Sequence, residues 1–191
     1  MKRYAMQMLT TTTACLLVLA SVSPAHAREC ADVRMPGTAQ VDGTTLTLNG
    51  MGIREATVFN VNVYVAGLYL ESRSRDGAAI LASAQRKRIV LHFVREVERG
   101  DVHEAFREGL ESGHVDAATI RRFLSWIPAA SEGSRFTFTY VPGTGTEVRI
   151  GRRVRGTIEG EAFARAFFGI WLGSEPPNAG LKRGLLGGSC G

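Results

Sequence analysis

The chain has few of the residue patterns that metal-dependent and nucleophilic enzymes need. His92, His103 and His114 stand alone, with no cysteine or carboxylate at the spacing of metal ligands. The G-x-S-x-G spacing at residues 187–191 has no strand-like run before it, and the glycines of residues 143–156 fall between strand-like runs rather than before a helix. These absences argue against a metalloenzyme, a serine hydrolase and a nucleotide-binding protein, and we expect no cofactor and no metal.

Long apolar runs are also scarce, because only the first segment has one. A short basic start precedes an apolar centre at residues 16–20, and Ala25-His26-Ala27 has the small residues that a signal peptidase recognises. The run is too short to cross a membrane as a helix. We therefore expect residues 1–27 to be a secretory signal and residues 28–191 to form one domain in the periplasm, with no membrane span after signal removal.

Acidic residues are fewer than basic ones. The 191-residue chain has 23 Lys and Arg against 18 Asp and Glu, a net charge of +5. Loss of Lys2 and Arg3 with the signal reduces the net charge to +3, since the signal contains no acidic residue. An exported protein with so small an excess of positive charge is not expected to bind nucleic acid.

Cysteine is limited to three residues, and Cys15 lies in the expected signal. Cys30 and Cys190 remain, near opposite ends of the domain. An even pair in an exported protein predicts a disulfide. A bond that closes nearly the whole domain stabilises it by about 4–5 kcal/mol in the chain-entropy model. The alternative is two separate thiols on frayed ends.

The sequence does contain an ordered series of strand and helix patterns. Alternation and apolar runs predict strands over 44–50, 61–70, 88–94, 135–141, 146–150 and 154–158. Caps and helical spacing predict helices over 76–84, from Asp101 with Glu104 as capping-box partner, over 116–127, over 161–172, and from Asn178. Strands and helices that are segregated in this way predict an α+β fold with an antiparallel sheet.

Two clusters of similar side chains have alternative interpretations. An apolar stripe on the predicted helix over 161–172 includes Phe163, Phe167 and Trp171. We interpret the stripe as core, and Trp171, near the helix end, is also a candidate for lining a pocket. Four arginines gather around a turn between strands: Arg149, Arg152, Arg153 and Arg155. We interpret this cluster as a solvated face, and the alternative is an anion site.

The stretch LNGMGIREATVFNVNVYVAGLYLES, which begins at residue 48, has a single arginine before its long apolar run. If the chain folds back about Phe59, Arg54 and Tyr64 are equidistant from the turn and face one another across an antiparallel pair. A guanidinium and a phenol against apolar walls suit a ligand with an anionic head and an apolar body. The alternative is a surface ion pair of Arg54 with Glu55 or Glu71.

This stretch resembles the chalcone-isomerase-like family, in which G-x-G-x-R is followed by a strand that ends in a G-x-Y-L-E-like phrase. Gly50, Gly52 and Arg54 match the first phrase, and residues 67–71 match the second. The phrase FFGIWLGSEPPNAGLKRGLLG at 167–187 is similar to the bacterial, exported branch. The resemblance implies an open-faced β-sandwich, with a large antiparallel sheet, helices layered on one side, and a cleft between them for an apolar ligand.

The resemblance also implies a role for Arg54. It matches an arginine that steadies a phenolate in the plant isomerases and holds a carboxylate in the fatty-acid-binding members. Tyr64 stands where the isomerases have a threonine, and it resembles the tyrosine of the fatty-acid-binding members. The helix segment GDVHEAFREGLES lacks the tyrosine, lysine and asparagine that the isomerases carry after their long strand.

We therefore expect a periplasmic protein that binds a small apolar anionic ligand, such as a fatty acid, through Arg54 and Tyr64. No catalytic residue is assigned. One alternative is an isomerase that closes a ring on a chalcone-like phenol, and a second is a structural or assembly partner in the envelope. The sequence assigns no oligomeric state.

Overall fold

The computed structural model describes residues 27–56 and 61–190. The expected signal peptide and the turn expected about Phe59 lie outside the described residues. Within those ranges the strands are β1 (Arg28–Cys30), β2 (Val33–Met35), β3 (Thr38–Val41), β4 (Thr44–Ala56), β5 (Val61–Leu70), β6 (Lys87–Phe93), β7 (Arg135–Val141), β8 (Gly145–Ile150) and β9 (Arg153–Ile158). The helices are α1 (Gly77–Ala82), α2 (Arg99–Ser112), α3 (Ala117–Ser125), α4 (Glu161–Leu172) and α5 (Ala179–Leu185).

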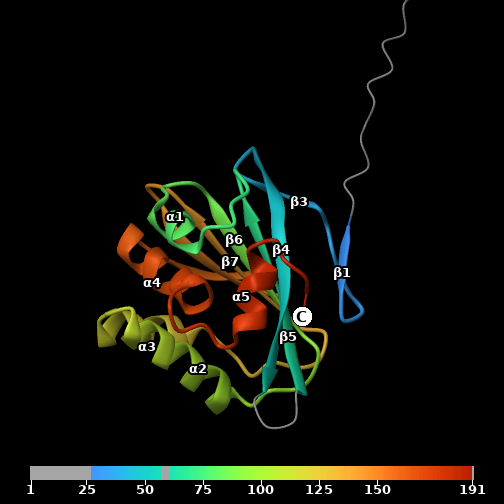
Figure 1. Ribbon diagram of the computed structural model, residues 1–191. Coiled ribbons are helices and arrows are strands. Elements are labelled where there is room, and N and C mark those ends of the chain that lie inside the picture. Colours follow the sequence, from blue (N-terminus) through green and yellow to red (C-terminus); the bar gives the residue numbers. More distant parts are fainter. Residues whose placement is uncertain (1–26, 57–60, 191) are drawn as a thin grey trace, which may run out of the picture.

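The strands from β3 to β9 form one antiparallel sheet in chain order, and β1 pairs with β2 in a separate hairpin (Figure 1). The helices lie on one face of the sheet, and the hairpin lies on the other face beside β4 (Figure 1). A large core separates the sheet from the helices, and a smaller one lies under the hairpin. This arrangement confirms the predicted α+β fold, an open-faced sandwich with its helices on one side.

Alternation along β5 distributes its side chains between the two cores. Ala66, Leu68 and Leu70 pack in the core on the helix side, whereas Val65 and Tyr69 pack under the hairpin. Successive residues of a strand point to opposite faces, so an uninterrupted apolar run fits a strand that is covered on both sides. The predicted strand over 61–70 is confirmed with its bounds.

The large core is built around aromatic rings from α4. Phe167 is fully buried, and its ring centroid lies 4.6 Å from that of Phe138 and 5.2 Å from that of Trp171. Further rings at centroid distances of 5.5 to 6.0 Å complete the cluster: Phe106, Phe123, Phe163 and Phe168. The predicted apolar stripe of the helix is therefore core, and the bounds predicted for this helix, 161–172, are confirmed.

Other predicted boundaries need correction. Helix α2 begins at Arg99 rather than Asp101, and the capping position Glu98 makes no side-chain cap. A bridge between Val97 and Ala130 keeps the chain extended up to that point, so the helix begins directly after it. Asp101 lies in the first turn, where a negative charge suits the helix dipole. Asp116 caps α3 as predicted, because its Oδ1 accepts from the amides of Ala118 and Thr119 at 3.0 and 2.9 Å.

Strand β4 is longer than predicted and extends to Ala56, so Arg54 lies inside this strand, near its end. Gly50 and Gly52 interrupt the alternation that the prediction relied on. Both glycines lie against α5, where an added Cβ at Gly50 would collide with the carbonyl of Gly184, and one at Gly52 with the carbonyl of Leu181. The glycines thus allow a helix to rest directly on the backbone of a strand.

The buried side chain of Asn49 stabilises the contact between β4 and α5. Its side chain is 3% exposed, and its Nδ2 donates to the carbonyls of Ser74 at 2.9 Å and Leu185 at 2.8 Å. Its Oδ1 accepts from the amide of Ser74 at 2.9 Å. One buried amide therefore ties β4 to the loop after β5 and to the end of α5.

We predict that Gly50→Ala lowers the free energy of unfolding by about 1–3 kcal/mol, because the new methyl group forces the backbones of β4 and α5 apart. Chemical denaturation measures the loss. Gly100→Ala is a matched control, since an added Cβ at Gly100 has nothing within 4 Å. Equal stability of the two variants would contradict the proposed reason for Gly50.

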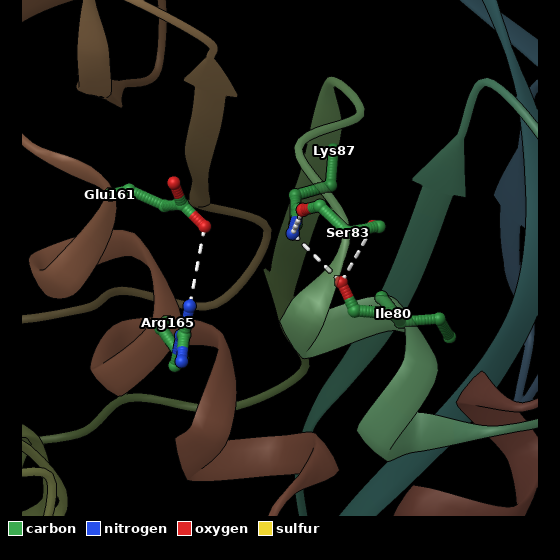
Figure 2. A network of polar contacts seen from close by, with 5 residues as sticks. All are labelled: Ile80, Ser83, Lys87, Glu161 and Arg165. Atoms are coloured by element: carbon green, nitrogen blue, oxygen red, sulfur yellow. Dashed lines mark hydrogen bonds and ion pairs between the residues drawn. The ribbon is translucent and has the colours of Figure 1, made fainter.

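A buried lysine closes α1. Lys87 is 2% exposed, and its Nζ donates to the carbonyls of Ile80 and Ser83, both at 2.8 Å (Figure 2). Burial lowers the pKa of Lys87, and the nearby Glu161 carboxylate opposes this shift. The ammonium satisfies carbonyls at the C-terminal end of the helix, so we assign Lys87 a structural role.

A disulfide joins Cys30 to Cys190, with 5.7 Å between the Cα atoms, as predicted. It connects β1 to the segment after α5, which returns beside the hairpin (Figure 1). No helix in the described part of the chain is long and apolar enough to cross a membrane.

Candidate ligand cleft

A cleft of about 1420 Å³ opens between the sheet, α2 and α4. Its inner wall is apolar and comes from all three elements: Leu91 and Phe93 from β6, Val102 and Phe106 from α2, and Ile170 and Trp171 from α4. Helices α2 and α4 approach one another at Gly109 of α2 and at Gly113, its C-cap residue, where an added Cβ would press on Ile170 and on Ala166 respectively. Ala105 of α2 is exposed and also lines the cleft.

Arg54 and Tyr64 both line the cleft. They are direct cross-strand partners in the β4–β5 pair, which confirms the predicted pairing, and a register shift after Arg54 makes Glu55 pair with Asn62. Gly50, Gly52 and Arg54 alternate along β4, and α5 covers the two glycines. Helix α5 begins at Ala179, after Asn178, whose side-chain amide donates to the carbonyl of Ile53 at 3.1 Å. The helix therefore leaves Arg54 half-buried and uncovered at the cleft.

Arg54 has no carboxylate partner among the described residues. Its guanidinium donates to the carbonyl of Glu55. Of the two partners considered from the sequence, Glu71 pairs instead with Arg86 at 3.2 Å, and the carboxylate of Glu55 forms no ion pair in the described part of the chain. The alternative of a surface ion pair is therefore not what the structure has. A half-buried guanidinium whose other N–H groups remain available to donate is a suitable partner for an anionic ligand.

Tyr64 is held by two aromatic neighbours. The indole Nε1 of Trp171 donates to the hydroxyl of Tyr64 at 3.0 Å, and the ring of Phe93 meets that of Tyr64 edge to face at 5.5 Å. Burial raises the pKa of Tyr64 to about 12, and Trp171 and Arg54 reduce the shift only in part. The phenol is thus neutral at physiological pH and keeps its proton for donation.

The rim of the cleft is rich in acidic residues. The exposed arginines among its lining residues are Arg95 and Arg165. Six exposed carboxylates also line it: Glu96, Glu98, Asp101, Glu108, Glu161 and Glu175. Solvent screens these exposed charges, whereas Arg54 is half-buried beside apolar rings. The strongest interaction for an anion is therefore expected at Arg54, next to Tyr64.

The comparison with protein families settles what kind of chain this is, because a family model described as chalcone isomerase-like matches residues 27–187. The chain belongs to the chalcone isomerase-like family. A solved structure, that of a fatty-acid binding protein of Arabidopsis thaliana, matches with a TM-score of 0.69 and 16% identity. The match covers 84% of this chain and 96% of that one. No curated protein matches.

The family phrase G-x-G-x-R now has a physical explanation in this chain. Its glycines seat α5 on β4, and its arginine is the next residue on the same face beyond the helix. The phrase therefore both seats a helix on the sheet and places a cation in the lining of the cleft. The assignment of this chalcone isomerase-like protein to an exported, bacterial branch of the family stays a prediction.

The remaining candidates from the sequence lie outside the cleft. His103 Nε2 lies 2.8 Å from the carbonyl of Ile127, and Arg135 Nε donates to His92 Nδ1 at 3.0 Å. No group of three potential metal ligands occurs in the described ranges. Of the four clustered arginines, Arg149 pairs with Glu147 at 3.0 Å, and the other three are exposed in and beside β9: Arg152, Arg153 and Arg155.

Sequence reasoning missed most of the cleft wall. Leu91 and Phe93 belong to a predicted strand, but the sequence does not reveal which of its faces meets a ligand. Trp171 was a candidate both for the core and for a pocket, and it has both positions: it is 1% exposed and it lines the cleft.

Proposed function

We propose that this chalcone isomerase-like protein binds a fatty-acid-like carboxylate, with the head group at Arg54 and Tyr64 and the apolar chain along the cleft. The pairing of these two residues in the lining of a cleft with an apolar wall carries the proposal. A guanidinium presents parallel donors to the two oxygens of a carboxylate, and a neutral phenol adds a further donor. The apolar wall supplies the hydrophobic contact that an acyl chain needs.

The size of the cleft supports a long ligand. Pockets for small molecules usually have volumes of about 300–1,000 Å³, and this cleft has about 1420 Å³. The name of the structural neighbour, a fatty-acid binding protein, agrees with a ligand of this class. A shared fold does not establish a shared ligand, so the side chains at the head-group end remain the main support.

We further propose that the protein works in the periplasm. The support is the signal-like start of the sequence and the disulfide between Cys30 and Cys190, which is typical of an oxidising compartment. Fractionation of cells that express the full chain tests this, and the protein should appear in the periplasmic fraction with a mass reduced by residues 1–27. Retention of the full-length chain in the cytoplasm would contradict it.

Ring closure on a chalcone is predicted to be slow. The α2 side chains that line the cleft include acidic, small and apolar groups but no tyrosine, lysine or asparagine to polarise a ketone. We expect no turnover near about 10 per second, the median for enzymes. Loss of chalcone absorbance with saturating protein is the measurement, and a rate of that order would favour an isomerase.

The binding proposal is tested first on the natural protein. Native mass spectrometry of protein purified from its own periplasm should show an added mass that matches a fatty acid. Delipidated protein should then bind decanoate saturably and with one site in calorimetry, whereas decane should bind much more weakly because it has no head group. If neither a bound acid nor saturable decanoate binding is found, the role of an envelope structural partner becomes the better hypothesis.

A further inference from the structure

The hydrogen bond between Trp171 and Tyr64 determines how the phenol can interact with a ligand. Trp171 lies in the last turn of α4, is 1% exposed, and has a single N–H that can only donate. That N–H is directed at the hydroxyl oxygen of Tyr64, 3.0 Å away. The acceptor capacity of the phenol is therefore used inside the protein, and its proton is left for another partner.

Arg54, like Tyr64, offers only hydrogen-bond donors to a ligand. A guanidinium has only donors, and the backbone carbonyl of Glu55 already accepts one of them. The two side chains that meet across β4 and β5 thus both offer protons, and the acidic acceptors of the cleft stand on its exposed rim. The pKa of about 12 for Tyr64 means that the phenol does not lose its proton at physiological pH.

We propose that Trp171 is a positioning residue that commits Tyr64 to donation, so that the cleft selects a head group with two acceptor oxygens, an ionised carboxylate. The proposal rests on the proposed function and adds a reason for its specificity. The primary amide of the same acid is nearly the same shape, but one of its two polar atoms is an NH₂ donor. At the head-group end that NH₂ faces donors and is left unpaired, which is costly in a partly desolvated site.

The test compares decanoate with decanamide by calorimetry in four proteins: wild type, Trp171→Phe, Tyr64→Phe and the double variant. Wild type should prefer the acid by at least about tenfold. Trp171→Phe frees an acceptor position on Tyr64, so this preference should fall about tenfold, mainly because the amide gains affinity. Tyr64→Phe should lose a similar part of the preference, and the double variant should lose no more than either single one, since both act through one hydrogen bond.

Trp126→Phe is the matched control, because Trp126 lies at the end of α3 against Gly156 and does not line the cleft. It should leave the preference unchanged. An unchanged preference in Trp171→Phe, together with a reduced one in Tyr64→Phe, would overturn the role of Trp171 and leave the proposed function intact. Absence of saturable decanoate binding in wild type would overturn the proposed function itself, and this proposal with it.

A second measurement does not depend on Trp171→Phe being folded. In nuclear magnetic resonance spectra, the indole N–H signal of Trp171 should move clearly in Tyr64→Phe, whereas that of Trp126 should not. Decanoate should perturb the Trp171 signal in wild type and much less in Tyr64→Phe. A Trp171 signal that is indifferent to the loss of the phenol would overturn the proposal, whatever the affinities are.

Discussion

Arg54→Ala is expected to weaken the binding of decanoate by about ten- to a hundredfold. The guanidinium is half-buried in the lining of the cleft, has no carboxylate partner in the described ranges, and lies across from Tyr64. A carboxylate bound there makes charge-assisted hydrogen bonds that alanine cannot replace. Arg54→Lys should recover only part of the affinity, because an ammonium lacks the planar pair of donors. Calorimetry gives the affinities of all three proteins.

Folding should survive the same substitution. Removal of Arg54 leaves no described carboxylate without its partner, so the midpoint of thermal unfolding should stay close to that of wild type. Arg153→Ala is a matched control, since it removes an exposed arginine of β9 far from the head-group residues along the chain. If Arg54→Ala unfolds at a much lower temperature while its affinity for decanoate holds, Arg54 is a structural residue.

Replacement of Cys30 and Cys190 by serine is expected to cost up to about 5 kcal/mol of unfolding free energy in the chain-entropy model. The bond closes a loop with a sequence separation of 160. It therefore removes much of the conformational freedom that the unfolded chain has without it. A loss of this size is a large part of the roughly 5–15 kcal/mol by which a domain is stable. Urea denaturation of the double variant and of wild type measures it.

The presence of the bond in the isolated protein is checked separately by mass. Unfolded, unreduced protein should resist alkylation at Cys30 and Cys190 and should take up two labels only after reduction. Two labels without reductant would show that the thiols are free. A double variant as stable as wild type would instead mean that the bond forms but that strain or residual structure in the unfolded chain cancels its effect.

The elements that sequence reasoning predicted with their bounds are those whose pattern is dense and uninterrupted. Strand β5 and helix α4 are covered over most of their length, so nearly every residue carries the pattern. Strand β4 was predicted too short because its two glycines interrupt the pattern, although they are there to receive α5. Strands β1 to β3 have three or four residues each, and alternation cannot be recognised over so short a run.

The candidate site was predictable only where it is local. Arg54 and Tyr64 are close in sequence, so the assumption of a hairpin about Phe59 placed them opposite one another, although the pairs nearer the turn are shifted by one residue. Tyr64 and Trp171 are 107 residues apart, and no spacing rule relates a strand residue to the last turn of a distant helix. Their contact follows from the way α4 packs across the whole sheet, and that packing depends on all the core side chains together.

The position of β9 at the end of the sheet has a consequence for association between copies of the protein. An edge strand presents unpaired backbone groups that can recruit another strand, and Val154 of β9 is 49% exposed. Arg153 and Arg155 flank Val154 on this edge, and Arg152 precedes them in the turn. We infer that mutual repulsion of these charges discourages edge-to-edge pairing of two copies.

Replacing the three arginines by threonine should therefore promote β-rich aggregation at concentrations where wild type stays dispersed. Light scattering follows the aggregation. An equally dispersed variant would show that the edge needs no such protection.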